Sequence, residues 1–456
     1  MGLQPHTASR ARPDASRDRF HATGRNLEER NMIVTVECPL WRRCRSRFSA
    51  GGVPRGAPTR PSTYPIEEIM GSQPSNTRRR LRFAGVAAVA VLAVVSLVAT
   101  ACSKSSSSGS SGGTIKAAWI YVGPVNDGGW TQAHDAGRKY VETKLGAKVK
   151  TTYKENVPEG PEVAQVINDL IKDGNTVIFA TSYGFKDAMQ AAATANPKVK
   201  FEMATGDSIT LGQKVASNYN EFYGAGEDAL YVTGIAAGKA TKNNTIGVSA
   251  PFAIPEVIRG INAFTLGAQS VNPAAKVNVV WTKTWFDPAV ERKSAESLVA
   301  AGADVIFSHQ DSPSAGEVAK ANNLPWFGYD SDQSGSYASV WQTAGTYNWG
   351  PFELSELNKV IDGTWKQNNY YGTIADNFAG LAPYGSTVAA GTKTLMDAEI
   401  TKAKAGKADA FGWYWGLADR QDQDGKTVIT KGQTLTMKDL YTMSYFVKGT
   451  TGSPKG

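Results

Sequence analysis

The sequence predicts an α/β fold made of two similar lobes, each built around a parallel sheet with helices on both faces. From Lys116 onwards, apolar runs of strand length alternate with patterns typical of helices. This alternation indicates parallel sheets, because each strand returns to its neighbour through a helix. An internal repeat indicates that the chain holds two such sheets.

Two stretches of equal length carry the repeat. "DLIKDGNTVIFATSYGF" (169–185) matches "SLVAAGADVIFSHQDSP" (297–313), and each holds a helix end, a glycine-containing turn, a "VIF" strand and a polar loop. Val177 and Val305, at matching positions, stand 128 residues apart. The Pro-containing loops of "IYVGPVNDGGW" and "IGVSAPFAIPEVI" match at nearly the same offset, 127 residues. Two agreeing offsets predict two copies of one architecture.

The elements of the first lobe follow in regular order. A strand over 116–123 precedes a helix whose apolar face holds Trp130, Ala133, Gly137, Tyr140 and Val141. The strand "AKVKTTYKE" precedes the helix "EVAQVINDLIKDG", the strand "TVIFAT" precedes the helix "KDAMQAAATA", and the strand "VKFEMAT" comes next. Each pair has the spacing of a strand–helix unit.

The repeat also sets the expected boundaries. We expect lobe 1 over 115–243 and lobe 2 over 244–348, with the segment 224–244 leading from the first to the second. The remaining 349–456 is expected to be a return segment that largely completes lobe 1.

The beginning of the chain has the pattern of a targeting segment. After the basic stretch "TRRRLRF", residues 84–99 form an uninterrupted apolar run that ends in small residues, as in a secretory signal. The run is shorter than the roughly 20 apolar residues that a membrane-spanning helix needs. We therefore expect a signal peptide over 70–101, with Met70 as the real start and 1–69 as a non-native or disordered extension.

The placement of the cysteines adds to this pattern. Small residues directly before Cys102 resemble the lipobox of bacterial lipoproteins, in which the cysteine is acylated. Ala99 stands where the lipobox usually has Leu, so an ordinary secretory signal is the alternative. A flexible Ser/Gly tether is expected over 102–114. Because Cys38 and Cys44 precede this point, the exported part would have neither disulfides nor thiol chemistry.

The positive charge does not indicate a nucleic-acid partner. The formal net charge is +8, but the first 101 residues contain 16 Arg and 7 acidic residues and so account for all of it. The rest of the chain is nearly neutral, so the positive charge says nothing about a partner of the folded part.

The expected architecture locates a ligand site. Ligands of open parallel sheets bind beyond the carboxyl ends of the strands, and two facing lobes bring both sets of strand-end loops to one cleft. The loops in question are 123–130, 181–187, 205–207, 249–255, 308–313 and 328–332.

These loops carry aromatic rings together with carboxylate and amide oxygens. The candidate ligand-binding residues are Asn126, Asp127, Trp130, Tyr183, Phe185, Phe252, Asp311, Asp330 and Asp332. An aromatic face stacks on a flat base with ~1–3 kcal/mol, and carboxylates accept hydrogen bonds from ring N–H groups, amines or hydroxyls. The pattern favours a flat, neutral and polar ligand.

Each candidate also has a purely structural interpretation. Trp130 and the two phenylalanines could be core residues, and Asp127 could cap the helix that follows it. Asp330 and Asp332 could form a turn.

Signals for catalysis are weak. The chain lacks a G-x-S-x-G elbow and a P-loop, and "GPVNDGG" does not match G-x-G-x-x-G. His309, beside Asp311, is the only histidine of the expected cleft. "DSDQS" lacks the glycine and the final glutamate of a calcium loop. We therefore expect a binding protein with no catalytic residue, no metal and no cofactor.

Several motifs in order resemble the basic membrane protein (BMP) family of substrate-binding lipoproteins. They are "YVGPVNDGGWTQAHDAGRKYVE", "KENVPEG", "TSYGF", "IPEVIRGINAF", "WFDPAVE", "DSPSAGEVA", "GYDSDQS", "NWGPF" and "LAPYG", and they extend over about residues 115–450. The resemblance implies a type I periplasmic-binding-protein-like fold, with two Rossmann-like lobes and a ligand cleft between them.

The resemblance also implies roles for particular residues. Family members commonly carry D-x-S-F-N in the first loop, with the Phe stacked on a base. Here Trp130 takes the place of that Phe, and Thr131 replaces the Asn, which weakens the expectation of a ribose contact. Asp311 and the loop of Asp330 and Asp332 match family positions near the base and the sugar.

The expected function is that of a lipid-anchored solute receptor on the extracytoplasmic face of the cell membrane. The resemblance implies a monomer that closes on a purine base or purine nucleoside and delivers it to an ABC permease and its ATPase. Three alternatives stay open: a sensory lipoprotein with the same ligand, a nucleosidase that uses His309 and Asp311, and a sugar receptor. The few Arg of the exported part, none of them in the cleft loops, favour a nucleobase over a sugar.

Overall fold

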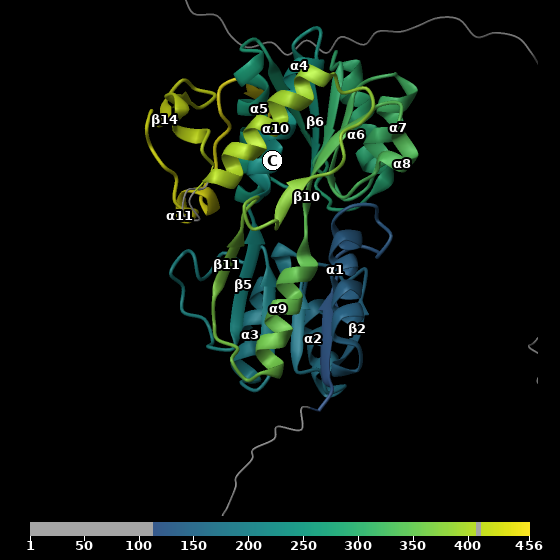
Figure 1. Cartoon of the computed structure of the whole chain (residues 1–456), viewed down its shortest axis with the longest axis vertical. Coiled ribbons are helices and arrows are strands. Elements are labelled where there is room, and N and C mark those ends of the chain that lie inside the picture. Colours follow the sequence, from purple (N-terminus) through teal and green to yellow (C-terminus); the bar gives the residue numbers. More distant parts are fainter. Residues whose placement is uncertain (1–112, 407–411) are drawn as a thin grey trace, which may run out of the picture. The chain divides into compact units, whose positions relative to one another are not determined.

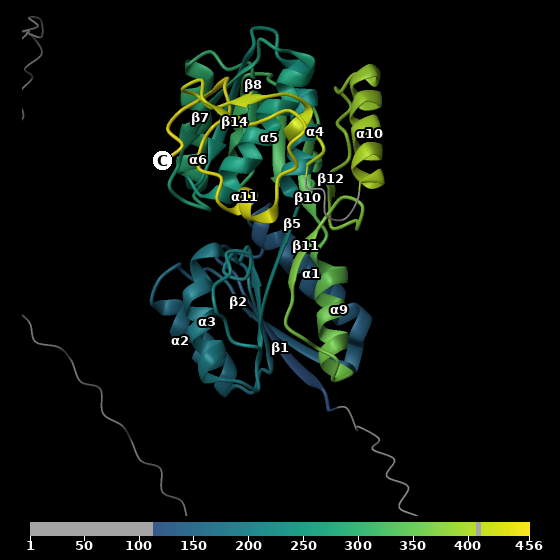
Figure 2. The ribbon, with the colours of Figure 1, turned by 90° about the vertical axis from the view of Figure 1, so that its left-hand side faces the viewer.

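The computed structural model describes residues 113–406 and 412–456, and they form two α/β lobes (Figures 1 and 2). The expected extension 1–69, the signal peptide 70–101, Cys102 and most of the tether lie outside the described residues. The two lobes confirm the predicted fold class. None of the helices in the described ranges is long and apolar enough to cross a membrane.

The first lobe has a six-stranded sheet in which all neighbours run parallel. Across the sheet the order is β11 (Asn369–Gly372), β5 (Tyr219–Gly224), β4 (Lys200–Ala204), β3 (Val177–Ala180), β1 (Ile115–Ile120) and β2 (Val149–Lys154). Its helices are α1 (Trp130–Leu145), α2 (Glu162–Lys172), α3 (Lys186–Ala195) and α9 (Trp349–Ile361), with short 3-10 turns at Gly146–Lys148 and Tyr183–Phe185.

The second lobe has a seven-stranded sheet, parallel except for the edge strand β12. The order is β12 (Ala379–Leu381), β10 (Trp341–Tyr347), β9 (Trp326–Asp330), β8 (Val305–Ser308), β6 (Thr245–Ala250), β7 (Lys276–Trp281) and β15 (Thr450–Thr451). Its helices are α4 (Gly226–Ala240), α5 (Pro255–Val271), α6 (Pro288–Ala300), α7 (Ser314–Ala321), α8 (Ser334–Tyr337), α10 (Ala390–Ala405) and α11 (Met437–Tyr441). A 3-10 turn, Trp415–Leu417, and a small ribbon of β13 (Arg420–Gln421) and β14 (Thr427–Ile429) complete the described part.

The sequence repeat occupies equivalent places in the two sheets. Val177 of β3 pairs with Ala117 of β1, and Val305 of β8 pairs with Ile246 of β6. All four residues of both "VIF" strands are buried. Continuous apolar runs of this kind are typical of central parallel strands, because helices cover both of their faces.

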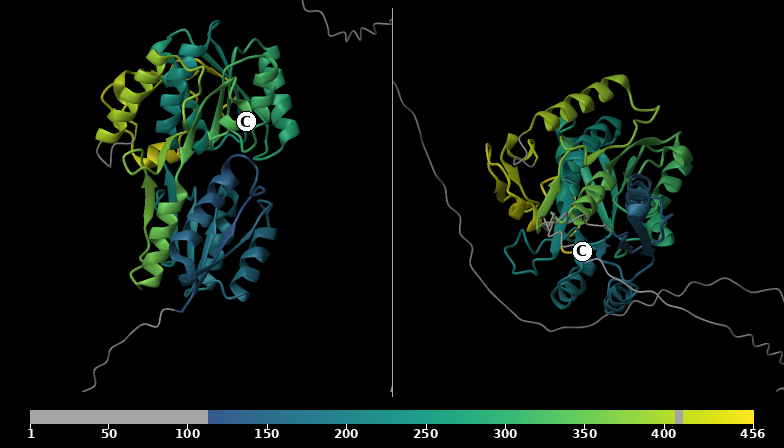
Figure 3. Two further views of the ribbon diagram at one scale, coloured as in Figure 1. Left: turned by 45° about the vertical axis from the view of Figure 1, so that its right-hand side comes forward. Right: turned by 60° about the horizontal axis from the view of Figure 1, so that its bottom comes forward.

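The last part of the chain divides between the lobes, which differs from the expectation that 349–456 largely completes lobe 1. Helix α9 packs on α1, and β11 joins the first sheet beside β5. After Gly372 the chain crosses to the second lobe, where β12 pairs with β10 and β15 pairs with β7. The C-terminal segment, yellow in Figures 1 and 3, accordingly lies on the second lobe.

The expected range 115–243 places helix α4 in lobe 1, but in the structure this helix belongs to the second lobe. It packs on α5 and β10 of the second lobe, and every residue from Gly226 to Gly238 is buried. A helix that is buried all round has no polar face to indicate which sheet it covers. Close packing with α5 depends on glycine, because a β-carbon at Gly234 would overlap the carbonyl oxygen of Phe264.

The chain therefore crosses between the lobes three times. The crossings lie between β5 and α4, between β10 and α9, and between β11 and β12. Figure 2 shows β5, β10 and β11 converging where the lobes meet. These crossings are the places where a change in backbone angle would open or close the lobes.

Candidate functional site

A cavity lies at the carboxyl ends of the strands and is lined by both lobes. The first lobe contributes Val122, Trp130, Ser182, Tyr183 and Thr205, and the second contributes Glu256, Trp285, His309, Asp311, Tyr329 and Asp330. The cavity is thus formed where the strand-end rule places a ligand.

The lobes touch each other at the rim of this cavity. The backbone carbonyl of Gly128 accepts hydrogen bonds from Ser331 Oγ and, at 2.6 Å, from Gln333 Nε2. Next to it, Gly129 packs so closely that a β-carbon there would lie 2.5 Å from the carbonyl oxygen of Asp311. The structure is therefore the closed arrangement of the two lobes.

Trp130 is both a wall of the cavity and part of the aromatic core beneath it. Its indole Nε1 donates a hydrogen bond of 2.6 Å to the carbonyl of Thr181. Its ring makes T-shaped contacts with those of His134, Tyr347 and Trp349 at centroid distances of 4.6, 6.1 and 5.3 Å. Only 7% of the residue is exposed. Trp130 therefore belongs both to the core and to the cavity lining, so the structural and the ligand-binding interpretations of this residue are compatible.

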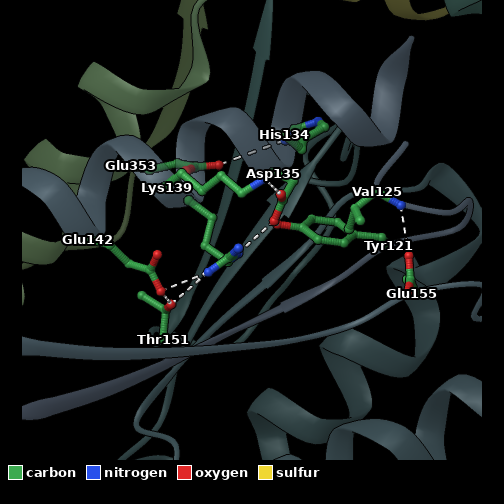
Figure 4. Close-up of polar contacts among 10 residues, drawn as sticks. Tyr121, Val125, His134, Asp135, Lys139, Glu142, Thr151, Glu155 and Glu353 are labelled. Carbon is green, nitrogen blue, oxygen red and sulfur yellow. Dashed lines mark hydrogen bonds and ion pairs between the residues drawn. The ribbon is translucent and has the colours of Figure 1, made fainter. Parts of the chain in front are cut away.

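The helix that carries Trp130 is anchored by polar contacts on its buried face (Figure 4). His134 Nδ1 lies 3.8 Å from Glu353 Oε1 of α9, and its ring stacks on Trp349 at 4.0 Å. Burial raises the pKa of Glu353 to about 8 and holds the pKa of His134 well below its usual value. Both groups are therefore neutral at pH 7, and the pair packs as part of the core. The buried carboxylate of Asp135 binds the exposed Lys139 at 2.7 Å.

Asp127 caps the start of α1. Its carboxylate accepts hydrogen bonds from the backbone N–H groups of Gly129 at 2.9 Å, Thr131 at 2.8 Å and Gln132 at 3.0 Å. Helix starts leave such N–H groups without partners, and an Asp side chain satisfies them. The Thr131 hydroxyl is also turned towards the backbone, where it accepts from the N–H of Gly123 at 3.2 Å. Neither side chain lines the cavity.

Asp311 and Asp330 bring buried carboxyl groups to the cavity with oxygens left unpaired. Within the described residues, Asp311 Oδ2 and both carboxyl oxygens of Asp330 make no hydrogen bond. Burial raises the pKa of both groups well above the usual value, and the nearby carboxylate of Asp127 adds to the effect. A buried polar atom without a partner costs ~1–3 kcal/mol. This arrangement therefore favours a ligand that supplies hydrogen bonds.

Two equivalent positions of the lobes hold strained backbone at the cavity. Thr205 follows β4 with φ of 61°, and Asp330 ends β9 with φ of 64°. The left-handed region is costly for residues other than glycine, and most of all for a β-branched residue such as Thr. Both residues line the cavity, and Thr205 Oγ1 has no partner among the described residues. Strain that recurs with unpaired polar atoms is typical of a functional site.

The remaining predicted residues occupy different places. Tyr183 lines the cavity with its ring, while its hydroxyl donates to Asp207 at 2.9 Å. Phe185 is fully buried in the core of the first lobe. Phe252 packs behind the cavity wall, with its ring 5.2 Å from that of Trp285. Asn126 and Asp332 are exposed, and the Asp332 carboxylate accepts from the N–H of Ser334.

Several lining residues were not among the candidates. Trp285 follows β7, a strand whose end was not included among the expected loops, although the same rule applies to it. Glu256 lies one residue beyond the expected loop 249–255, in the first turn of α5. Tyr329 and His309 lie in expected loops but are not among the candidate ligand-binding residues. Burial and the positive charge of Arg259 lower the pKa of His309 to about 3, so it is neutral.

The chain has relatives among known protein families and proteins. The model of the Bmp family, described as "ABC transporter substrate-binding protein PnrA-like", matches residues 114–391. A purine-binding protein of Brucella abortus is 35% identical over 335 residues, which cover 74% of this chain and 92% of that protein. A candidate ABC transporter glucose-binding protein of Haloferax volcanii is 34% identical over 286 residues, which cover 62% of this chain and 71% of that protein.

Solved structures share the architecture. An ABC transporter solute-binding protein from Aeropyrum pernix superposes with a TM-score of 0.57 and 14% identity, over 64% of this chain and 92% of that one. At this identity the likeness shows the fold alone.

Proposed function

Because the chain belongs to the Bmp family of PnrA-like ABC transporter substrate-binding proteins, we propose that it binds a purine base or purine nucleoside and delivers it to an ABC permease. The Brucella relative, named as purine-binding, supports this ligand class and aligns over most of both chains. In this proposal the closing of the lobes captures the ligand, which shifts the protein towards the closed form by its extra affinity for that form.

The unpaired carboxyl groups of Asp311 and Asp330 carry the proposal. A protonated carboxyl group offers one donor and one acceptor, and an ionised one offers only acceptors. The edge of a purine presents ring N–H groups, ring nitrogens and exocyclic groups, so either form finds partners. The rings of Trp130, Tyr183, Trp285 and Tyr329 line the same cavity and supply faces or edges for a flat heterocycle.

The free base fits these observations better than the nucleoside. The Thr131 hydroxyl, at the position where the family has a ribose-binding Asn, is occupied by the Gly123 N–H. The Asp127 carboxylate is occupied by three backbone N–H groups. Neither side chain lines the cavity, so neither is placed to bind the hydroxyl groups of a ribose there.

Glucose is the second candidate ligand. The Haloferax relative is named for it, and its identity to this chain is close to that of the purine-binding relative. Tryptophan faces and carboxylates also suit sugars. Among the lining residues, however, no Arg is present to hold hydroxyl groups, and buried Arg259 contacts Glu227 behind the cavity.

The cellular role completes the proposal. We place the folded part on the extracytoplasmic face of the membrane, held by a lipid on Cys102. It would bind its ligand without chemical change, with no metal or cofactor.

Calorimetric titration of the purified protein tests the ligand class. The panel is adenine, hypoxanthine, guanine, adenosine, inosine, guanosine and glucose. We expect a purine base to bind tightest, and Trp130→Ala to weaken it about 10- to 100-fold, because a lost aromatic stack costs ~1–3 kcal/mol. Trp281→Ala is the matched control, since Trp281 stacks on Phe446 away from the cavity. Binding of glucose alone would overturn the purine proposal.

A further inference from the structure

A chain of hydroxyl groups joins two residues of the cavity lining through two tyrosines outside it. The hydroxyls of Tyr329 and Tyr347 lie 3.1 Å apart, and Tyr347 donates to the Tyr223 hydroxyl at 2.9 Å. Tyr223 in turn donates to Glu256 Oε1 at 2.9 Å. The chain therefore begins at Tyr329 and ends at Glu256, and both of these line the cavity.

The hydrogen bonds donated by Tyr347 and Tyr223 set the direction of the bond between Tyr329 and Tyr347. Each phenol carries a single proton, and those of Tyr347 and Tyr223 are already donated. Tyr329 must then donate to Tyr347. Hydrogen bonds aligned in one direction polarise each other and strengthen the last acceptor, so the chain holds Glu256 Oε1 in place. Glu256 Oε2 makes no hydrogen bond among the residues that the structure describes, and Glu256 lines the cavity.

Two of the hydrogen-bonded tyrosines stand at crossings between the lobes. Tyr223 lies next to the end of β5, directly before the crossing to α4, and Tyr347 ends β10, directly before the crossing to α9. The hydroxyl of Tyr347 packs against the beginning of α4, where a β-carbon on Gly226 would overlap it. Rotation of the backbone at either crossing would therefore move the hydroxyl group of Tyr223 or of Tyr347.

The surroundings of Glu256 fit a ligand-contacting group. Its side chain is only partly buried, while Val257 to Gly260 after it are fully buried. Arg259, one turn along the helix, lies over the rings of Tyr223 and Tyr441 at 5.3 and 4.9 Å. Arg259 makes its ion pair with Glu227, and within the described residues Glu256 has no salt-bridge partner.

We propose that Glu256 is a specificity-determining residue of the cavity and that Tyr223 and Tyr347 are its positioning residues. The inference rests on the proposed binding function but not on the identity of the ligand. Through the hydrogen-bonded hydroxyl groups, the two crossings would orient the Glu256 carboxyl group towards the ligand only when the lobes are closed. A ligand with a donor in reach of Oε2 would then be preferred over one without it.

The test compares the affinities of Glu256→Gln, Tyr223→Phe, Tyr347→Phe and the double variant Tyr223→Phe/Glu256→Gln by calorimetry on the same seven compounds. We expect Glu256→Gln to change the affinity ratio between the best two ligands at least tenfold. Each Tyr→Phe variant should shift that ratio in the same direction by about three- to tenfold. The double variant should differ from Glu256→Gln by less than twofold, because the tyrosines act through Glu256.

The matched control is Tyr219→Phe on the same strand as Tyr223. Its hydroxyl is also buried and donates to a carboxylate, Glu221 Oε1, at 3.2 Å, but away from the cavity. A ratio unchanged in Glu256→Gln would overturn the role of Glu256. Effects of Tyr223→Phe that multiply with those of Glu256→Gln would overturn the positioning role. If glucose binds and purines do not, the purine proposal fails, while the same variants still decide the role of Glu256 on glucose and its weaker competitors.

Discussion

The indole nitrogen of Trp285 donates a hydrogen bond of 2.9 Å to Glu159, and it does so from one lobe to the other. Glu159 lies in the loop after β2 and also accepts from the N–H of Gly184 at 2.8 Å. Trp285 lines the cavity and contacts the ring of Phe252. A single side chain thus forms part of the cavity wall and part of the contact that holds the lobes together.

Trp285→Phe should weaken ligand binding about three- to tenfold, mainly through faster dissociation. The phenyl ring keeps an aromatic wall, but the hydrogen bond to Glu159 is lost, and such a bond is worth ~0.5–1.5 kcal/mol. Stopped-flow fluorescence measures the dissociation rate. Trp281→Phe is the control, because it loses a similar indole hydrogen bond, to Ser453, outside the cavity. Equal dissociation rates for wild type and Trp285→Phe would show that this contact does not hold the closed form.

Gly129→Ala should prevent full closure of the two lobes. The obstacle to closure is the backbone of Asp311 across the cleft, because a β-carbon on residue 129 would lie 2.5 Å from its carbonyl oxygen. We expect at least a tenfold loss of affinity and a larger radius of gyration in the presence of ligand, measured by small-angle X-ray scattering. Gly335→Ala is the control, because a β-carbon added there would meet no atom within 4 Å. A compact, tightly binding Gly129→Ala variant would contradict the closed arrangement described here.

Asp330→Asn should weaken ligand binding without lowering the stability of the unliganded protein. Asn tolerates the left-handed backbone at this position and removes a buried, unpaired carboxyl group. We expect the unliganded variant to be at least as stable as the wild type in urea unfolding, and its affinity to fall at least tenfold. Asp332→Asn, on the exposed neighbour, should change neither quantity. Lower stability with unchanged affinity would mean that Asp330 serves the fold rather than the ligand.

The sequence was sufficient for the architecture because the relevant signals are local. The alternation of apolar strands and helices, and the repeated "VIF" strands, indicated two parallel sheets, and the strand ends then located the cavity. The strand ends predict four residues that line the cavity: Trp130, Tyr183, Asp311 and Asp330.

The lining was less predictable because it depends on the direction of each side chain. Phe185 stands in an expected loop, but its ring turns into the core, and Asp127 is occupied by the start of α1. Trp285 and Glu256 come from a strand end and a helix turn that carry no distinctive local pattern. The fully buried helix α4 likewise gave no sign of the sheet on which it packs.

The buried pair of His134 and Glu353 predicts how stability depends on pH. Burial raises the pKa of Glu353 from 4.5 to about 8, so the folded state holds a proton that the unfolded chain releases above pH 4.5. Its contribution to stability is therefore complete below that pH and is lost as the pH rises through about 8. Between pH 5 and 8 this group should lower the free energy of unfolding by up to about 1.4 kcal/mol per pH unit.

Glu353→Gln should remove that dependence, because the amide stays neutral at every pH. Urea unfolding at pH 5, 6, 7 and 8 should give a shallower decline than for the wild type, with the variant the more stable protein at pH 8. His134, whose pKa burial lowers, and Glu256 and Glu291, whose pKa values burial raises to about 7, are present in both proteins, so the difference between the curves reports Glu353. The exposed Glu296→Gln variant should follow the wild-type curve. Parallel curves for wild type and Glu353→Gln would mean that Glu353 is ionised beside His134 in the folded protein, and that the support beneath Trp130 is an ion pair.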